Sequence, residues 1–147
     1  MKNKIPSLVK NIGIIWEGEQ PGGVDTYLYN LINTEIFKEI NFYIFTNKNN
    51  HGAKRLLKNL NNRKINFIYF TSLNSITSKN IFLKILIIIF KPLLFLISIF
   101  QIYFLIKNYR FDVFLGQCGG YGDFRSEMAG MFVAKFLKFP VRTLVIH

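Results

Sequence analysis

Short apolar runs alternate along the chain with longer segments whose apolar residues recur at helical spacing. The apolar runs predict five buried strands, at residues 12–16, 42–46, 65–70, 112–115 and 141–146. The segments between them predict helices, which begin at Val24, lie around Ala53–Leu60 and cover Ile81–Ile106 and about Phe124–Leu137. This alternation predicts one α/β domain over residues 1–147, a doubly wound parallel sheet whose right-handed crossovers give the strand order 3-2-1-4-5.

The turn after the first predicted strand is the most informative local pattern. Gly22 and Gly23 stand between the strand at 12–16 and the helix that begins at Val24. A strand, a glycine turn and a helix in this order direct backbone N–H groups and the positive helix end at an anion, usually a phosphate. The alternative is a tight packing turn. The chain contains neither G-x-G-x-x-G nor G-K-[ST], which excludes a dinucleotide fingerprint and a P-loop.

The charge is strongly positive, with a formal net charge of +11 at pH 7. The stretch Ile40–Phe111 contains no Asp or Glu, and its Lys and Arg residues account for the whole excess. Such a stretch predicts an anionic partner, either nucleic acid or a membrane surface of acidic lipid. Nucleic acid is disfavoured because the basic residues between 48 and 64 have no stacking aromatics among them.

Cysteine usage and the first residues bear on the compartment. Cys118 stands alone, which excludes an intramolecular disulfide, suits a reducing cytoplasm and predicts an inert thiol with no metal site. The apolar part of residues 1–10 is too short for a secretory signal. We therefore expect a cytoplasmic protein, attached peripherally to the inner face of the plasma membrane through its basic stretch.

The segment Ile81–Ile106 is apolar over almost its whole length. Its longest uncharged stretch, Pro92–Ile106, is shorter than the roughly 20 residues that span hydrocarbon. Pro92 should kink or restart the helix. A narrow polar stripe runs along one side, formed by Asn80, Lys84, Lys91 and Ser98. Three interpretations stay open: a buried crossover helix, a helix in the membrane interface whose lysines reach the headgroups, and a true span.

Three motifs resemble the N-terminal half of GT-B-fold glycosyltransferases of the large group 1, or family 4, type. Gly22-Gly23-Val24 is similar to the "GGV" loop of that family, and Phe111–Phe114 to its "PDV" strand, with Phe111 in place of the usual proline. The segment Phe139–His147 is similar to its "IPVV-T-VH" strand, whose terminal histidine lies in the catalytic cleft. The resemblance implies a Rossmann-like domain, one half of a GT-B fold.

The resemblance also implies a function. The chain would be the acceptor-side domain of an enzyme that transfers sugar from a sugar nucleotide in bacterial surface polysaccharide or glycolipid synthesis. Its implied partners are the sugar nucleotide, with no further cofactor, and a glycan or lipid-linked acceptor. The C-terminal domain that holds the donor is absent, so we expect a chain that is inactive alone: a fragment, a truncated reading frame, or one part of a split enzyme whose partner is a separate C-terminal domain chain. The alternatives are a non-catalytic basic domain that binds nucleic acid, and a small membrane protein.

Site residues follow from these motifs. The resemblance makes His147 the candidate catalytic residue, while Gly22 and Gly23 are candidates for phosphate binding. Further candidates for substrate binding follow the fourth strand: Gly119, Gly120, Tyr121 and Asp123. Each of two has a structural alternative: Asp123 is as well placed to cap the helix that begins at Phe124 as to bind sugar. Tyr121 could stack on a sugar or only pack within its loop. Less specific candidates are a carboxylate base at Glu17 or Glu19 and a phosphate contact at Arg125.

Overall fold

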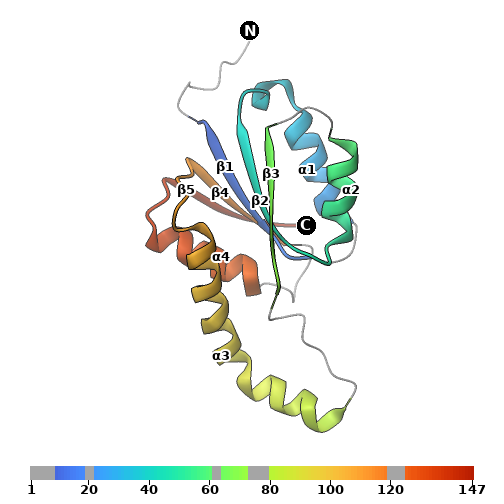
Figure 1. Ribbon diagram of the computed structural model, residues 1–147, viewed down its shortest axis with the longest axis vertical. Helices are drawn as coiled ribbons and strands as arrows, with labels where there is room; N and C mark the ends of the chain where they lie inside the picture. The colour runs from blue at the N-terminus through green and yellow to red at the C-terminus, as the bar shows by residue number, and fades with distance from the viewer. Residues whose placement is uncertain (1–8, 19–21, 61–63, 73–79, 119–124) are drawn as a thin grey trace.

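A computed structural model describes residues 9–18, 22–60, 64–72, 80–118 and 125–147 (Figure 1). Its five strands form one all-parallel sheet in the order β3-β2-β1-β4-β5, so the predicted fold class and strand order are confirmed. The fold is Rossmann-like. In chain order the elements are β1 (Asn11–Trp16), α1 (Gly23–Asn33), the short 3-10 helix η1 (Glu35–Phe37), β2 (Asn41–Asn47), α2 (His51–Asn59), β3 (Ile65–Phe70), α3 (Ile81–Ile106), β4 (Val113–Cys118), α4 (Arg125–Phe136) and β5 (Val141–Ile146).

Helices cover both faces of the sheet (Figure 1). Because side chains alternate along a strand, Ile14 and Ile44 point to the face covered by α1 and α2, while Ile15 and Phe45 point to the face of α3 and α4. All four side chains are fully buried. Both faces of the central strands are therefore core, which is why these strands read as continuous apolar runs.

The fourth strand is longer than predicted. We expected it to end at Gly116, but β4 runs on to Cys118, with Gly116 paired to Leu144 and Cys118 to Ile146 of β5. Gly116 is a packing glycine and not a strand end, since a Cβ there would lie 2.7 Å from Leu144 Cδ1. The two additional residues matter for the site, because they carry the strand to the carboxyl edge of the sheet.

The second helix also begins earlier than predicted. Asn50 caps α2, its side chain accepting the N–H of Ala53 at 2.9 Å, so the helix starts at His51 and ends at Asn59. The Asn50 side chain in turn donates to the Thr46 hydroxyl at 2.8 Å and ties the helix start to β2. This capping contact is a local bond that the apolar pattern does not reveal.

The third helix runs through Pro92 without a break, although Figure 1 shows that its direction changes about halfway. Near its carboxyl end, Ile102 and Ile106 are buried against the sheet, whereas the first half extends away from the body. The interpretation as a buried crossover helix is therefore wrong for the first half. Within the described residues, the part Ile85–Ile106 is long and apolar enough to cross a membrane by length and composition.

Two of the four residues expected to form a polar stripe on this helix, Lys91 and Ser98, do not face outward, while Asn80 at its start is exposed. Ser98 is buried and donates its hydroxyl to the Leu94 carbonyl at 2.9 Å, while Lys91 is half-buried. These two residues lie nearly above one another on the helix, so this side of α3 faces the body of the protein. The side turned to the outside is apolar.

Candidate functional site

The strongest candidate site lies at the carboxyl edge of the sheet, between β1 and β4. The chain crosses from β3 on one side of β1 to β4 on the other, which makes this the point where the strand order reverses. Ligands of open α/β sheets bind in the crevice outside the strand ends at such a point. The amino ends of α1 and α4, which follow β1 and β4, lie at the same edge.

His147 follows β5 and lies beside the first turns of α1. Its backbone N–H donates to the Cys118 carbonyl at 3.1 Å, which holds the residue to the end of β4. Its Nε2 lies 2.8 Å from Gln117 Oε1, and its ring lies 5.0 Å from the Tyr27 ring, centroid to centroid. Tyr27 follows Gly23 by about one helical turn. The structure thus brings His147 near the start of α1.

Gln117 fixes the orientation of the histidine ring. Its side chain is fully buried, and in the tautomer that carries the proton on Nε2 the imidazole donates to Gln117 Oε1. Nδ1 is then left as the ring nitrogen able to accept a hydrogen bond. A histidine held this way can contact a hydroxyl group of a bound ligand.

Two buried glutamates join β1 to α4. The backbone N–H of Glu17 donates to Glu127 Oε1 at 2.8 Å, and the Ser126 N–H donates to Glu17 Oε2 at 3.2 Å. A carboxylate at a helix amino end is stabilised by the helix dipole. Glu17 therefore holds the start of α4, a structural role that we prefer to the expected catalytic base.

The glycines at the start of α1 differ in their surroundings. The Gly22 N–H donates to Asp25 Oδ1 at 2.7 Å, which uses this donor within the protein. The Gly23 N–H belongs to the first helical turn and has no partner within the helix. A Cβ at either glycine would meet none of the described atoms within 4 Å, so the packing-turn interpretation finds no support here. Gly23 is the better placed of the two for an anion.

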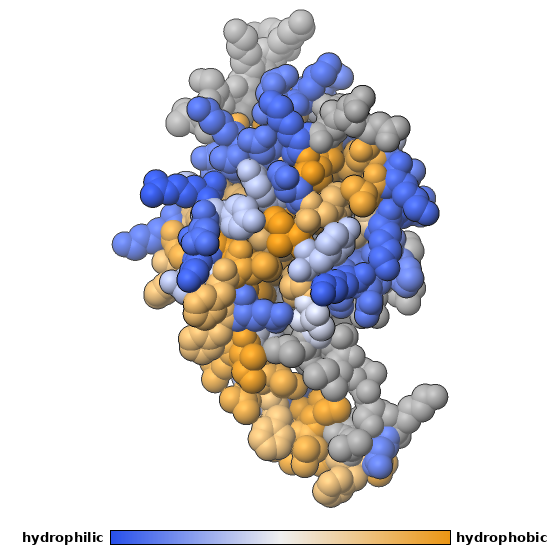
Figure 2. All heavy atoms as spheres, in the orientation of Figure 1, coloured by the Kyte–Doolittle hydropathy of each residue, from blue (hydrophilic) through white to orange (hydrophobic). Residues whose placement is uncertain are grey.

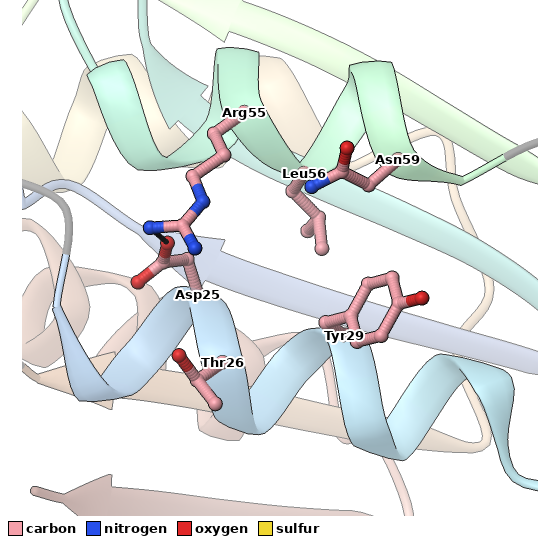
Figure 3. A pocket seen from close by; sticks show the side chains of 6 residues that line it. All are labelled: Asp25, Thr26, Tyr29, Arg55, Leu56 and Asn59. Carbon is pink, nitrogen blue, oxygen red and sulfur yellow. Dashed lines mark ion pairs between the residues drawn. The ribbon is translucent and has the colours of Figure 1, made fainter.

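A small hollow lies between α1 and α2, apart from His147 (Figure 3). It has a volume of about 150 Å³, and its lining residues are Asp25, Thr26, Tyr29, Arg55, Leu56 and Asn59. Arg55 Nη1 lies 3.7 Å from Asp25 Oδ2, and Figure 3 shows the two side chains pointing toward one another. This ion pair offsets the negative charge that Asp25 places at the start of α1.

Cys118 stands at the end of β4, next to the site. The side chain is buried, and burial together with the nearby Glu127 charge raises the pKa of the thiol to about 12. Because the thiolate is the reactive form of cysteine, this environment supports the expected inert thiol.

Other predicted candidates are not placed by the structure. Gly119, Gly120, Tyr121 and Asp123 lie outside the described residues, as does Glu19. Among the residues that the structure does describe, no three His, Cys, Asp or Glu side chains gather as a metal site would require.

Three residues of the site escaped the sequence reasoning. Tyr27 lies within the predicted first helix, is partly exposed and contacts His147. Gln117 lies beyond the predicted end of the fourth strand, but in the structure it belongs to β4. Glu127 lies in the first turn of α4 and is buried. The one sequence signal for this part of the site is a polar residue, Gln117, directly after Gly116.

No model of a known protein family matches the chain, and no curated protein sequence matches it either. The class of the protein rests on the fold. It is a Rossmann-like α/β protein with a histidine, a buried glutamine and a glycine helix start at the strand-order reversal.

Proposed function

We propose that this chain is the acceptor-side domain of a GT-B-fold glycosyltransferase that uses a sugar nucleotide in bacterial surface polysaccharide or glycolipid synthesis. The observation that carries the proposal is the contact between His147 and Tyr27, which puts the end of the "VH"-like strand beside the "GGV"-like start of α1. Tyr27 and His147 are far apart in sequence, yet their rings meet at the carboxyl edge of the sheet.

The chemistry of this edge suits glycosyl transfer. Departure of a nucleoside diphosphate leaves charge on the leaving phosphate, and N–H donors at a helix amino end stabilise charge where it develops. The first turn of α1, which begins at Gly23, is positioned for that contact. His147, oriented by Gln117, is positioned to bond a sugar hydroxyl. The sugar nucleotide is the substrate, and the proposal involves no other cofactor.

The "PDV"-like motif at Phe111–Phe114 has a structural basis of its own. Asp112 Oδ2 accepts the N–H groups of Lys10 at 2.7 Å and Asn11 at 2.9 Å, which ties the start of β4 to the start of β1. Phe111, where the family has proline, stacks on Tyr109 and packs edge-to-face on Phe139. Aromatic packing replaces the rigidity of a proline ring before the strand.

A binding experiment tests the proposal. We expect titration of the isotope-labelled full chain with UDP-glucose to shift the backbone amide signals of Gly23, Tyr27 and His147, weakly because an acceptor-side domain contacts only the diphosphate and sugar of the donor. We expect His147→Gln to weaken this response and His51→Gln, a change of the other histidine in an exposed position on α2, to leave it unchanged. The His147 variant isolates the ring, since the backbone bond to Cys118 remains.

The same titration can contradict the proposal. Shifts confined to the exposed lysines of α2, or equal responses of the two histidine variants, would assign the binding to general positive charge. A salt-sensitive gel shift with single-stranded DNA, together with no response to UDP-glucose, would favour the nucleic-acid alternative.

A further inference from the structure

The outward side of α3 carries an unbroken row of large apolar residues, here called the α3 stripe. Its members follow one another at intervals of three or four and so share one side of the helix. All are exposed in the structure: Phe82, Leu86, Ile89, Leu93, Leu96, Phe100 and Phe104. The exposed fractions reach 69% at Phe82 and 66% at Ile89. This is the inverse of an ordinary surface helix, whose outward side is polar.

The apolar surface continues onto α4. Phe95 of α3 packs edge-to-face on Phe132, and Tyr103 on Phe136, with ring centroids 6.2 Å and 5.9 Å apart. The two α4 phenylalanines are themselves largely exposed, Phe136 at 74%. Figure 2 shows the apolar surface as one continuous area that runs from the body to the tip of α3. An area of this extent on a single chain marks an interaction surface.

The first half of α3 extends past the carboxyl edge of the sheet (Figure 1). The Gln101 side chain donates to the Thr71 carbonyl at 2.9 Å, directly after β3 ends, which fixes where the helix passes this edge. The core clusters of the described residues include α3 side chains from Phe95 onward. The preceding part, Ile81–Leu93, is about 20 Å long at 1.5 Å per residue. The tip of α3 and the candidate site therefore lie toward the same end of the molecule.

The charges around this surface have one sign. The exposed charged residues that the structure describes on or directly after α3 and α4 are all basic: Lys107, Arg110, Lys135 and Lys138. Lys107 Nζ lies 4.5 Å from the ring centroid of Phe104, at the end of the α3 stripe. The described carboxylates that are exposed are Glu35 and Glu39, which pair with Lys38 and Lys64 near the amino edge of the sheet.

We propose that the apolar face of α3 and α4 docks into the interface of an anionic bilayer, with the carboxyl edge of the sheet turned toward the lipid. Apolar side chains enter below the headgroups, while the bordering lysines and arginines contact the acidic headgroups. This inference goes beyond the proposed function and does not depend on it. If both hold, the site faces the surface from which a lipid-linked acceptor would be presented.

Two other occupants fit the surface less well. A second copy of the chain would bring the same basic residues together, and a helix pair needs only a narrow seam with polar flanks. Here the positions beside the α3 stripe are also apolar and exposed, among them Ile85, Phe90 and Ile97. A membrane span over Ile85–Ile106 would have to pull Ile102 and Ile106 out of the core, where both are buried.

Vesicle flotation tests the proposal with the full chain. We expect binding to vesicles of phosphatidylcholine with phosphatidylglycerol, weaker binding at high salt, and release by alkaline carbonate. The double variant Phe82→Glu/Ile89→Glu should lose about tenfold or more in vesicle affinity, because two inserted side chains are replaced by charges. The matched control, Ile36→Glu/Leu57→Glu, adds the same charge at exposed apolar residues, 51% and 50% exposed, that lie away from α3.

The outcomes separate the occupants. Equal losses in the two double variants would show that net charge alone drives binding and would overturn the assignment of this surface. A stable dimer that Phe82→Glu/Ile89→Glu dissociates, with no vesicle binding, would overturn it in favour of a second copy. Resistance to carbonate would overturn the in-plane arrangement in favour of a span.

A fluorescence measurement locates the inserted part directly. An environment-sensitive dye on Ile89→Cys should shift its emission to the blue when vesicles are added, and the same dye on Leu57→Cys should not. Labelling is selective because the native Cys118 is buried and its thiol pKa is raised to about 12. No shift at position 89 in vesicle-bound protein would overturn the insertion of α3.

Discussion

Asp112 illustrates how a residue can be placed for structure within a motif that resembles an enzyme family. Its carboxylate accepts two backbone N–H groups from the segment that leads into β1, and its own N–H donates to the Asn11 carbonyl at 3.0 Å. The same residue accepts the Val141 N–H at 3.3 Å, so it joins the starts of β1, β4 and β5. A carboxylate serves here because charged acceptors make the stronger hydrogen bonds.

The buried thiol of Cys118 gives a prediction about pH. Its pKa is raised from 9.0 to about 12, first by burial and second by the Glu127 charge. Below the ordinary value the thiol is protonated in both the folded and the unfolded chain. As the pH rises from about 9 to about 12, the unfolded chain releases this proton while the folded one keeps it, so the free energy of unfolding falls.

Urea unfolding across this pH range provides the measurement. We expect wild type to lose more stability than Cys118→Ala between about pH 8 and pH 10, since the variant lacks the titrating group while the other titrating side chains are shared. The thiol of the folded protein should also react slowly with a disulfide reagent at about pH 8. Equal pH dependence of the two proteins would contradict the raised pKa.

At the scale of elements, α4 approaches the sheet closely because it has a glycine where it crosses β1. A Cβ at Gly130 would lie 2.9 Å from Ile15 Cγ2 and 3.1 Å from Ile15 Cδ1. Alanine favours a helix over glycine by about 1 kcal/mol. The contact with a fully buried β-branched side chain should outweigh that gain, since overpacking a core costs about 1–3 kcal/mol.

We therefore predict that Gly130→Ala lowers the free energy of unfolding by about 1 kcal/mol. Chemical denaturation of Gly130→Ala, Ile15→Ala and the double variant gives the interaction energy. The double variant should be more stable than the sum of the single changes implies, because Ile15→Ala removes the two atoms nearest to the new Cβ and leaves Phe114 Cε1 as the next contact at 3.4 Å. If the two changes in the free energy of unfolding simply add, α4 and β1 move apart to accommodate the new methyl group.

The elements could be predicted from the sequence better than the site could. All five strands and their order follow from apolar runs and right-handed crossovers, since burial on both faces leaves a strong signal. The end of β4 could not be placed, because in the sequence a glycine that ends a strand and a glycine that packs within one cannot be told apart. The partnership of Gln117 with His147 depends on a strand pairing across 30 residues, which no local pattern encodes.

At the scale of the whole molecule, the two halves of α3 differ in what stabilises them. Ile102 and Ile106 belong with Phe111 and Phe114 to one core cluster, while Ile81–Leu93 extends beyond it. A helical segment of this length is marginal in water without tertiary packing. The apolar first half therefore depends on whatever surface covers it, and local opening should cost little there.

Amide hydrogen exchange should reveal this difference. In solution we expect fast exchange over Ile81–Leu93 and strong protection from Ile102 to Ile106, since only the second part shares the stability of the core. Anionic vesicles should slow exchange in the first half by at least about tenfold and leave β1 and β2 unchanged, because a bilayer holds helical N–H groups in their hydrogen bonds. Neutral vesicles should have a smaller effect at equal lipid, given the basic residues that border the surface. Protection of the first half in lipid-free monomer would show that this segment is stable by itself and needs no partner surface.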